Sequence, residues 1–168
     1  IARVNWQGSP RLVMLVGGGY DVRYESATYS TGGTSVDKGA GIYMFDADNG
    51  ELLWWGGSQA ENSSSSSQIS EMRHSIVSRI NALDRDSDGL ADHLYFADLG
   101  GQVWRIDLNK AMQLVDTTNA SDITQNTFIL NSHLLFKTAH SQRFYEAPTF
   151  SVYGHGNKTK ALLSIAAS

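Results

Sequence analysis

Four aspartates fall within nine residues near the middle of the chain. They belong to a D-x-D-x-D-G-x-x-D segment over residues 84–92, which turns at its one glycine, Gly89. This composition and spacing are typical of a calcium loop, in which aspartate side chains and one backbone carbonyl bind the ion through oxygen. The predicted metal ligands are Asp84, Asp86, Asp88, Leu90 through its carbonyl, and Asp92.

The chemistry of these ligands favours one metal. Carboxylates packed this closely repel one another by roughly 1 kcal/mol per pair at about 4 Å even in water, so the loop favours a bound cation. Calcium accepts oxygen-only ligands in a flexible geometry, whereas zinc prefers Cys or His and magnesium takes fewer protein ligands. We therefore expect Ca²⁺ as the cofactor. The alternative is a solvated acidic turn of the kind that Asp-Gly sequences often form.

The segments on either side of the loop have the composition of β-strands. Residues 75–83 lead in and residues 93–98 lead out, and both are short runs rich in β-branched, aromatic and apolar residues. An EF-hand would place a bidentate Glu at the twelfth position of its loop, but that residue is Tyr95, inside the apolar run. We therefore expect the loop to join two strands.

Composition places the chain among globular, β-rich proteins. With 168 residues, 41% hydrophobic content, 16 Gly and 2 Pro, it predicts one folded unit with many tight turns. The formal net charge of −4 and the lack of a Lys/Arg cluster argue against nucleic-acid binding. No apolar run is long enough to span a membrane, and the lack of Cys excludes disulfides. The sequence opens in an apparent strand, which we interpret as part of a longer protein.

A repeat of about 75 residues organises the chain. Residues 1–5 match residues 77–81, at an offset of 76, and residues 150–153 fall on the same frame. The offset grows to 82 at the next strand, so we expect six extra residues in the middle copy, within the acidic loop. That second strand is expected in the three copies at residues 11–19, 93–101 and 160–168.

Further strands complete the unit, and four short antiparallel strands per copy describe a β-propeller blade. They are expected at residues 41–46, 52–55, 102–107 and 133–138, and Asn49-Gly50 between the first two is a hairpin turn signal. The predicted fold is all-β: a β-propeller fragment of about two and a half blades, with the calcium loop between the first two strands of the second blade. Together the blades form one partial domain over residues 1–168, at about 1–56, 75–138 and 147–168.

Long insertions separate some of these strands, at residues 20–40, 57–74 and 109–131. Loops of this length on a compact scaffold are often functional. We expect the serine run at residues 63–67 to be a flexible, solvated linker, and we expect a short helix at residues 109–114.

No catalytic constellation is visible in the sequence, and we do not expect an enzyme. The five His residues show no metal-binding spacing, and Gly17-Gly18-Gly19 lacks the Lys and Ser/Thr that follow in a phosphate-binding loop. Three tryptophans in expected strands are interpreted as packing residues rather than as a binding site. They are Trp54, Trp55 and Trp104.

The order of these segments resembles a known family. A strand, the D-x-D-x-D-G-x-x-D loop and the run over residues 94–108 look like the C-terminal propeller of the PilY/PilC-type proteins of bacterial type IV pili. Residues 17–21 and 41–54 lie upstream as they do in that family. The resemblance covers residues 1–108.

This resemblance implies a calcium-binding protein at the pilus tip that promotes pilus biogenesis, regulates extension and retraction in twitching motility, and in some members adheres to host surfaces. The implied partners are minor pilins or other tip components and a host-cell surface, with no nucleic acid and no membrane span in this segment. The implied location is the pilus tip at the cell surface, or the periplasm or outer membrane of a Gram-negative bacterium. In that family, the calcium ligands correspond to Asp84, Asp86, Asp88, Leu90 and Asp92.

Two other propeller classes share parts of this pattern. An integrin-like ligand-binding propeller carries similar calcium loops in successive blades, but the first and third copies have only residues 5–10 and 154–159 at that place. A quinoprotein dehydrogenase repeat resembles residues 41–54 and uses calcium beside its cofactor. Against it, the chain lacks the vicinal Cys pair of many such enzymes. Both remain open as alternatives.

Overall fold

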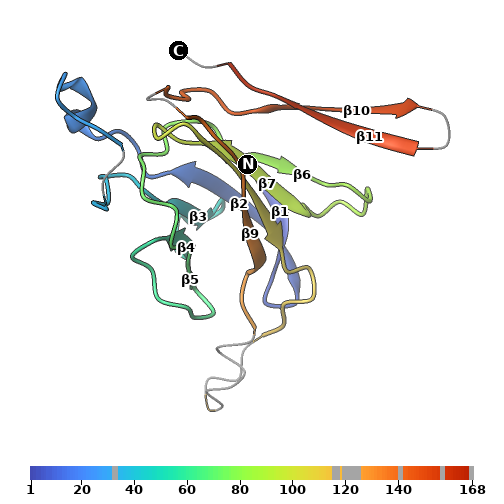
Figure 1. Cartoon of the computed structure of the whole chain (residues 1–168). Helices are drawn as coiled ribbons and strands as arrows, with labels where there is room; N and C mark the ends of the chain where they lie inside the picture. Colours follow the sequence, from blue (N-terminus) through green and yellow to red (C-terminus); the bar gives the residue numbers. More distant parts are fainter. Residues whose placement is uncertain (32–33, 115–117, 119–125, 140–141, 156–157, 167–168) are drawn as a thin grey trace.

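The computed structural model describes residues 1–31, 34–114, 118, 126–139, 142–155 and 158–166 (Figure 1). Within these residues the protein is all-β, as predicted, and its strands form three sheets without an α-helix. One 3-10 turn, η1 (Val22–Glu25), lies in the first insertion. In this part of the chain no helix is long and apolar enough to cross a membrane.

The first sheet contains five strands in the order β1-β2-β3-β4-β5. Its first four strands pair antiparallel in chain order. A tight turn at Asn49-Gly50 joins β3 to β4, where Gly50 has a φ of 77° that suits glycine. The strands are β1 (Ala2–Trp6), β2 (Ser9–Gly17), β3 (Ile42–Asp46), β4 (Leu52–Gly57) and β5 (Ser66–Gln68).

The serine run does not form the solvated linker that its composition suggests. Ser66 and Ser67 are buried in β5, which pairs parallel with β4. The Trp54 indole Nε1 donates a hydrogen bond to the Ser67 hydroxyl at 3.1 Å, and the Ser66 hydroxyl donates to the Glu61 carbonyl at 2.6 Å. Buried hydroxyl groups need hydrogen-bond partners, and the Trp54 indole supplies one for Ser67. This bond favours the strand β5 at the end of the serine run.

The second sheet has four antiparallel strands in the order β6-β7-β8-β9 and packs against the first (Figure 1). Buried side chains of the two sheets form one core, with Met44 and Trp54 from the first sheet beside Leu94 and Trp104 from the second. Burial of these apolar side chains is the main force that holds the sheets together. The strands are β6 (Asn81–Leu83), β7 (His93–Ala97), β8 (Gln102–Leu108) and β9 (Ile129–Lys137).

The first strand of the second sheet begins later than predicted. Asn81 pairs with Tyr95, whereas Ala2 pairs with Val13, so the two first strands correspond at an offset of 79 rather than 76. The second strands keep the offset of 82, which leaves three extra residues in the middle copy rather than six. The Ile76 backbone and the Ser75 hydroxyl bond instead to loops of the first sheet, and Ser78 bonds to Ala97 of β7 through its hydroxyl rather than its backbone. These contacts draw the segment out of the ladder.

The helix predicted at residues 109–114 is also wrong, because the segment forms a turn. The Asn109 side chain holds this turn: its Oδ1 accepts from the Ala111 N–H at 3.1 Å, and its Nδ2 donates to the Thr127 carbonyl at 2.9 Å. Met112 then points into the core, where it is fully buried. The turn therefore anchors the start of the third insertion, at residues 109–114, to the core.

A third sheet, of two antiparallel strands, lies over the side of the second sheet that faces away from the first (Figure 1). The rings of Tyr95 in β7 and Phe150 in β10 are 5.4 Å apart. Three sheets therefore stack in the order of the sequence. The strands are β10 (Thr149–His155) and β11 (Lys158–Ser164). The small core below them contains Ala97, Val103, Phe144, Leu163 and Ile165.

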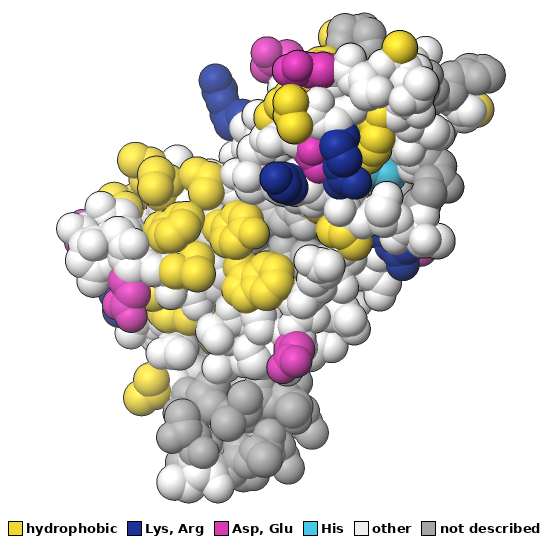
Figure 2. Space-filling model, turned by 90° about the vertical axis from the view of Figure 1, so that its left-hand side faces the viewer, with side chains coloured by type: hydrophobic (Ala, Val, Ile, Leu, Met, Phe, Trp, Pro, Cys, Tyr) yellow, Lys and Arg dark blue, Asp and Glu magenta, His cyan; other side chains and the backbone are white. Residues whose placement is uncertain are grey.

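The outer face of the first sheet is apolar and open (Figure 2). Leu12 and Met14 of β2 are each 42% exposed, and Leu52 of β4 is 48% exposed. In the same face the rings of Tyr43 and Trp55 stack with their centroids 6.1 Å apart. An apolar face of this kind is unusual on a folded domain and marks an interaction site.

The corresponding face of the second sheet is covered. Leu94 and Phe96 of β7 occupy the repeat positions of Leu12 and Met14, and both are fully buried against the first sheet. The outer face of the first sheet therefore has the pattern of a face on which another sheet packs.

We expect the isolated chain to self-associate through this open face, since water-exposed apolar patches favour association. Replacing Met14 and Leu52 together by Lys should shift the chain toward monomer, as measured by light scattering during size-exclusion chromatography over a range of concentrations. Val22→Lys, at a residue that is 63% exposed outside this face, is the control. A wild-type chain that stays monomeric at every concentration would contradict the prediction.

The turn between β7 and β8 is built around a fully buried carboxylate. Asp98 accepts hydrogen bonds from two backbone N–H groups of the turn, at 2.9 and 3.0 Å, and from the Trp104 indole at 2.9 Å. The His74 ring lies against this turn, and its Nδ1 is 3.2 Å from the buried Asp37 carboxylate in the first insertion. The insertion is thereby attached to the second sheet.

Asp98 predicts a pH dependence of stability. Burial raises the pKa of its carboxyl to about 6, and hydrogen bonds together with His74 only partly oppose the shift. The pKa in the folded protein lies above the ordinary value of 3.8, so the folded state holds the carboxyl proton more tightly than the unfolded state does. The stabilisation that this proton gives to the folded state is complete below about pH 4 and is lost as the pH rises through about 6. The stability advantage of the wild type over Asp98→Asn should increase by about 1 kcal/mol from pH 7 to pH 5. Urea unfolding at each pH measures it, and an unchanged difference would refute the assignment.

Candidate metal centre

The acidic loop spans residues 84–92 between β6 and β7, in the first hairpin of the second sheet. Its C-terminal end is attached to two other strands. The Asp92 carbonyl accepts a hydrogen bond from the Leu108 N–H of β8 at 2.9 Å. The Ala91 N–H donates to the Arg3 carbonyl of β1 at 2.9 Å. The sheets therefore fix the base of the loop while its middle lies at the surface.

Backbone N–H groups inside the loop orient its carboxylates. Asp84 accepts hydrogen bonds from the N–H groups of Ser87 at 2.7 Å and Gly89 at 2.8 Å. Asp88 accepts from the Leu90 N–H at 2.9 Å. The chain turns this tightly because Ser87 and Gly89 both have positive φ, of 63° and 89°. The carboxylates are thus arranged by the loop's own backbone.

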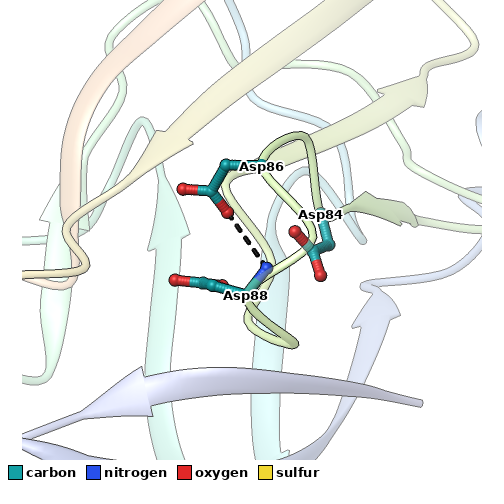
Figure 3. A group of neighbouring side chains, drawn as sticks. All are labelled: Asp84, Asp86 and Asp88. Atoms are coloured by element: carbon teal, nitrogen blue, oxygen red, sulfur yellow. Dashed lines mark hydrogen bonds between the residues drawn. The ribbon is translucent and has the colours of Figure 1, made fainter.

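Three of the predicted ligands lie together in space (Figure 3). Asp84, Asp86 and Asp88 each offer a carboxylate oxygen, and these oxygens lie within 4.8 Å of one another. Asp86 and Asp88 project to the same side of the loop. Asp92, at the end of the loop, is not part of this group, and its side chain is 15% exposed. Leu90 is in the same loop, and the role of its carbonyl stays a prediction.

A lysine distant in sequence, Lys110, joins the aspartates of the loop. The Lys110 Nζ lies 3.0 Å from both Asp86 oxygens, 2.6 Å from an Asp88 oxygen and 3.0 Å from an Asp92 oxygen. Lys110 follows β8, and only the pairing of β8 with β7 brings it back to the loop. The sequence does contain a signal for this contact. Lys110 lies just beyond β8, and β8 pairs with β7, the strand that follows the loop.

The lysine and the aspartates stabilise each other's charged forms. The hydrogen bond from Lys110 lowers the pKa of Asp88, and the Leu90 N–H adds to this effect. Burial would raise the pKa of Asp92, but the Arg85 N–H and Lys110 outweigh it, so the pKa is lowered. Burial would lower the pKa of Lys110, but the surrounding carboxylates outweigh it and raise the pKa. All three groups are therefore charged at neutral pH.

The donor set of the loop suits a hard divalent cation. Its side-chain ligands are all carboxylates, the chain contains no Cys, and the Nδ1 of the nearby His93 is already paired with Asp107 at 2.8 Å. Oxygen-only ligands of this kind favour calcium over zinc. The residues that would hold calcium are Asp84, Asp86, Asp88 and Asp92 through side chains and Leu90 through its carbonyl.

The histidines of the second sheet belong to a different cluster. His93 and His133 flank Asp107, at 2.8 and 2.9 Å, and Arg105 donates to the same carboxylate at 2.7 and 2.9 Å. This cluster has one carboxylate, and both of its oxygens already accept hydrogen bonds from the guanidinium group, so it is a poor metal site.

Comparisons with protein-family models, curated proteins and solved structures find no match to this chain. They assign no family.

Proposed function

We propose that this chain is the calcium-binding part of a β-propeller and that it acts in a protein of the type IV pilus tip. The observation that carries the calcium proposal is the group of three loop carboxylates within 4.8 Å of one another, on a loop whose end is attached to neighbouring strands. The pilus proposal rests on the resemblance of residues 1–108 to the PilY/PilC-type proteins.

The stacking of the sheets supports the propeller. The second sheet is covered on one face by the first sheet and on the other by the third. In a propeller each blade packs between its neighbours around a central axis. This arrangement accounts for the open apolar face of the first sheet, which would receive another blade. The chain then corresponds to two blades and the first hairpin of a third.

Calcium in this loop would act on structure rather than on a reaction. The loop lies in a hairpin, and in the described part of the chain its carboxylates bond to loop N–H groups and to Lys110. An ion held there would fix the hairpin and the surface around it, which makes the site a switch of local order. In a pilus protein, this switch would regulate biogenesis, the balance of extension and retraction in twitching motility, and adhesion.

The integrin-like alternative predicts the same loop in successive hairpins. The β1–β2 hairpin turns instead through Gln7-Gly8, with φ of 52° and 84°. The turn between β10 and β11 lies outside the described residues. A calcium loop in one of the two described first hairpins favours a local regulatory site over a repeated ligand-binding surface.

Isothermal titration of the chain with calcium tests the proposal. We expect one ion per chain with a Kd of about micromolar or weaker, because the loop lacks the bidentate Glu of tight EF-hand sites. Magnesium should bind much more weakly in the same buffer, since it requires a more rigid octahedral set of ligands. Absence of calcium uptake, or equal affinity for the two ions, would refute the proposal.

A further inference from the structure

We propose that Lys110 is a built-in counterion of the acidic loop, which takes the cation position when calcium is absent and is displaced when calcium binds. The inference rests on the proposed function, since it concerns the regulation of the same loop. The observation behind it is a single ammonium group shared by three carboxylates.

The Lys110 ammonium contacts carboxylates from both halves of the loop. Nζ lies 3.0 Å from both oxygens of Asp86, 2.6 Å from Asp88 and 3.0 Å from Asp92. These are three of the four side chains proposed to bind calcium. An exposed ion pair contributes little to stability, but the Lys110 side chain is only 24% exposed and directs its donors into the cluster. It therefore compensates a large part of the repulsion within the loop.

The backbone of Lys110 is held by contacts that do not involve its ammonium group. The amide of Asn5, a buried residue of β1, donates to the Lys110 carbonyl at 2.7 Å and to the Met112 carbonyl at 2.8 Å. The preceding residue, Asn109, donates its backbone N–H to the Phe128 carbonyl at 2.8 Å. Because these bonds fix the main chain, the ammonium can leave the cluster by rotation of its flexible side chain alone.

Calcium and the ammonium compete for these carboxylates. Calcium takes about six to eight oxygen ligands at about 2.3 to 2.6 Å, and the oxygens of Asp86, Asp88 and Asp92 now accept hydrogen bonds from Lys110. Two cations within one cluster would also repel each other strongly at this distance. We therefore expect calcium binding to displace Lys110 from the cluster. The exchange lowers the calcium affinity of the loop and moves a positive charge to the surface.

Lys110→Met tests the exchange, because it removes the charge and keeps a side chain of similar shape. In isothermal titration this variant should bind calcium about tenfold or more tightly than the wild type, since calcium no longer displaces a charged hydrogen-bond donor. Lys110→Gln is a second variant in case the first does not fold. Lys137→Met, at an exposed lysine of β9, is the matched control and should keep the wild-type affinity.

A second measurement uses the unaltered chain. Acetylation by an amine-reactive reagent, followed by peptide mass spectrometry, reports the access of each lysine. We expect Lys110 to react slowly without calcium and as fast as Lys137 with saturating calcium. The change should be absent at Lys137.

The outcomes separate this inference from the proposed function. If the wild type and the Lys110 variants bind calcium equally well, or if calcium leaves the reactivity of Lys110 unchanged, the exchange is wrong while the calcium site stands. If none of these proteins binds calcium, the proposed function fails and the exchange fails with it. If only the Lys110 variants bind calcium, the lysine replaces the ion permanently, which overturns a reversible exchange.

Discussion

Replacing Asp88 by Ala is expected to abolish calcium binding and to leave the β fold intact. Asp88 belongs to the group of carboxylates within 4.8 Å of one another, and calcium needs about six to eight oxygen ligands, so the loss of one side chain leaves too few. The Asp88 side chain is 43% exposed, and its removal takes nothing from the core. Isothermal titration measures the affinity, and far-UV circular dichroism checks the fold.

Asp48→Ala is the matched control, because Asp48 is also an exposed aspartate in a hairpin turn, between β3 and β4. It should keep the wild-type calcium affinity. In the full-length pilus protein that we propose, Asp88→Ala should disturb pilus extension and twitching motility at a normal protein level. Normal motility together with lost calcium binding would show that the site is only structural, and the functional assignment would be wrong.

The largest loss of stability is expected for Trp54→Ala. Trp54 is fully buried where the two sheets meet, and its ring lies 5.1 Å from that of Phe128. The substitution creates a cavity and leaves the buried Ser67 hydroxyl without its indole donor. We expect a cost of about 3 to 5 kcal/mol, which is a large part of the stability of a small domain. Urea unfolding of the two proteins measures the difference.

Trp55→Ala provides the comparison one residue further along the same strand. Trp55 stacks on Tyr43 in the open outer face, where it is only partly buried. Loss of that ring contact should cost about 1 kcal/mol. Equal costs for the two tryptophans would show that the inner and outer faces of β4 are assigned incorrectly.

The hairpins could be predicted from sequence because they depend on neighbouring residues. Alternating apolar residues and a turn such as Asn49-Gly50 are enough to place β3 and β4. The acidic loop could be found for the same reason, since its residues are adjacent in the chain and their spacing alone brings Asp84, Asp86 and Asp88 together.

Features that depend on distant partners could not be predicted. Lys110 reaches the loop only through the register of β7 with β8, and its own neighbours in sequence suggested a helix. Ser66 and Ser67 have the composition of a linker, and the hydrogen bond from the Trp54 indole to Ser67 depends on a residue outside the serine run. Residues 75–80 have strand composition, but the Ile76 backbone bonds to loops of the first sheet. Tertiary contacts decided each of these cases against local preference.

The short strand β5 also determines how the first sheet ends. A free edge strand offers unpaired N–H and C=O groups to any other chain, and short polar strands are a common protection against such pairing. β5 covers one edge of β4 with serine and glutamine, whereas β9, at the end of the second sheet, is nine residues long and exposes Leu130, Leu135 and Phe136. The serine run thus protects the β5 edge of the first sheet from edge-to-edge pairing, whereas β9 offers a longer and more apolar edge to a neighbouring strand.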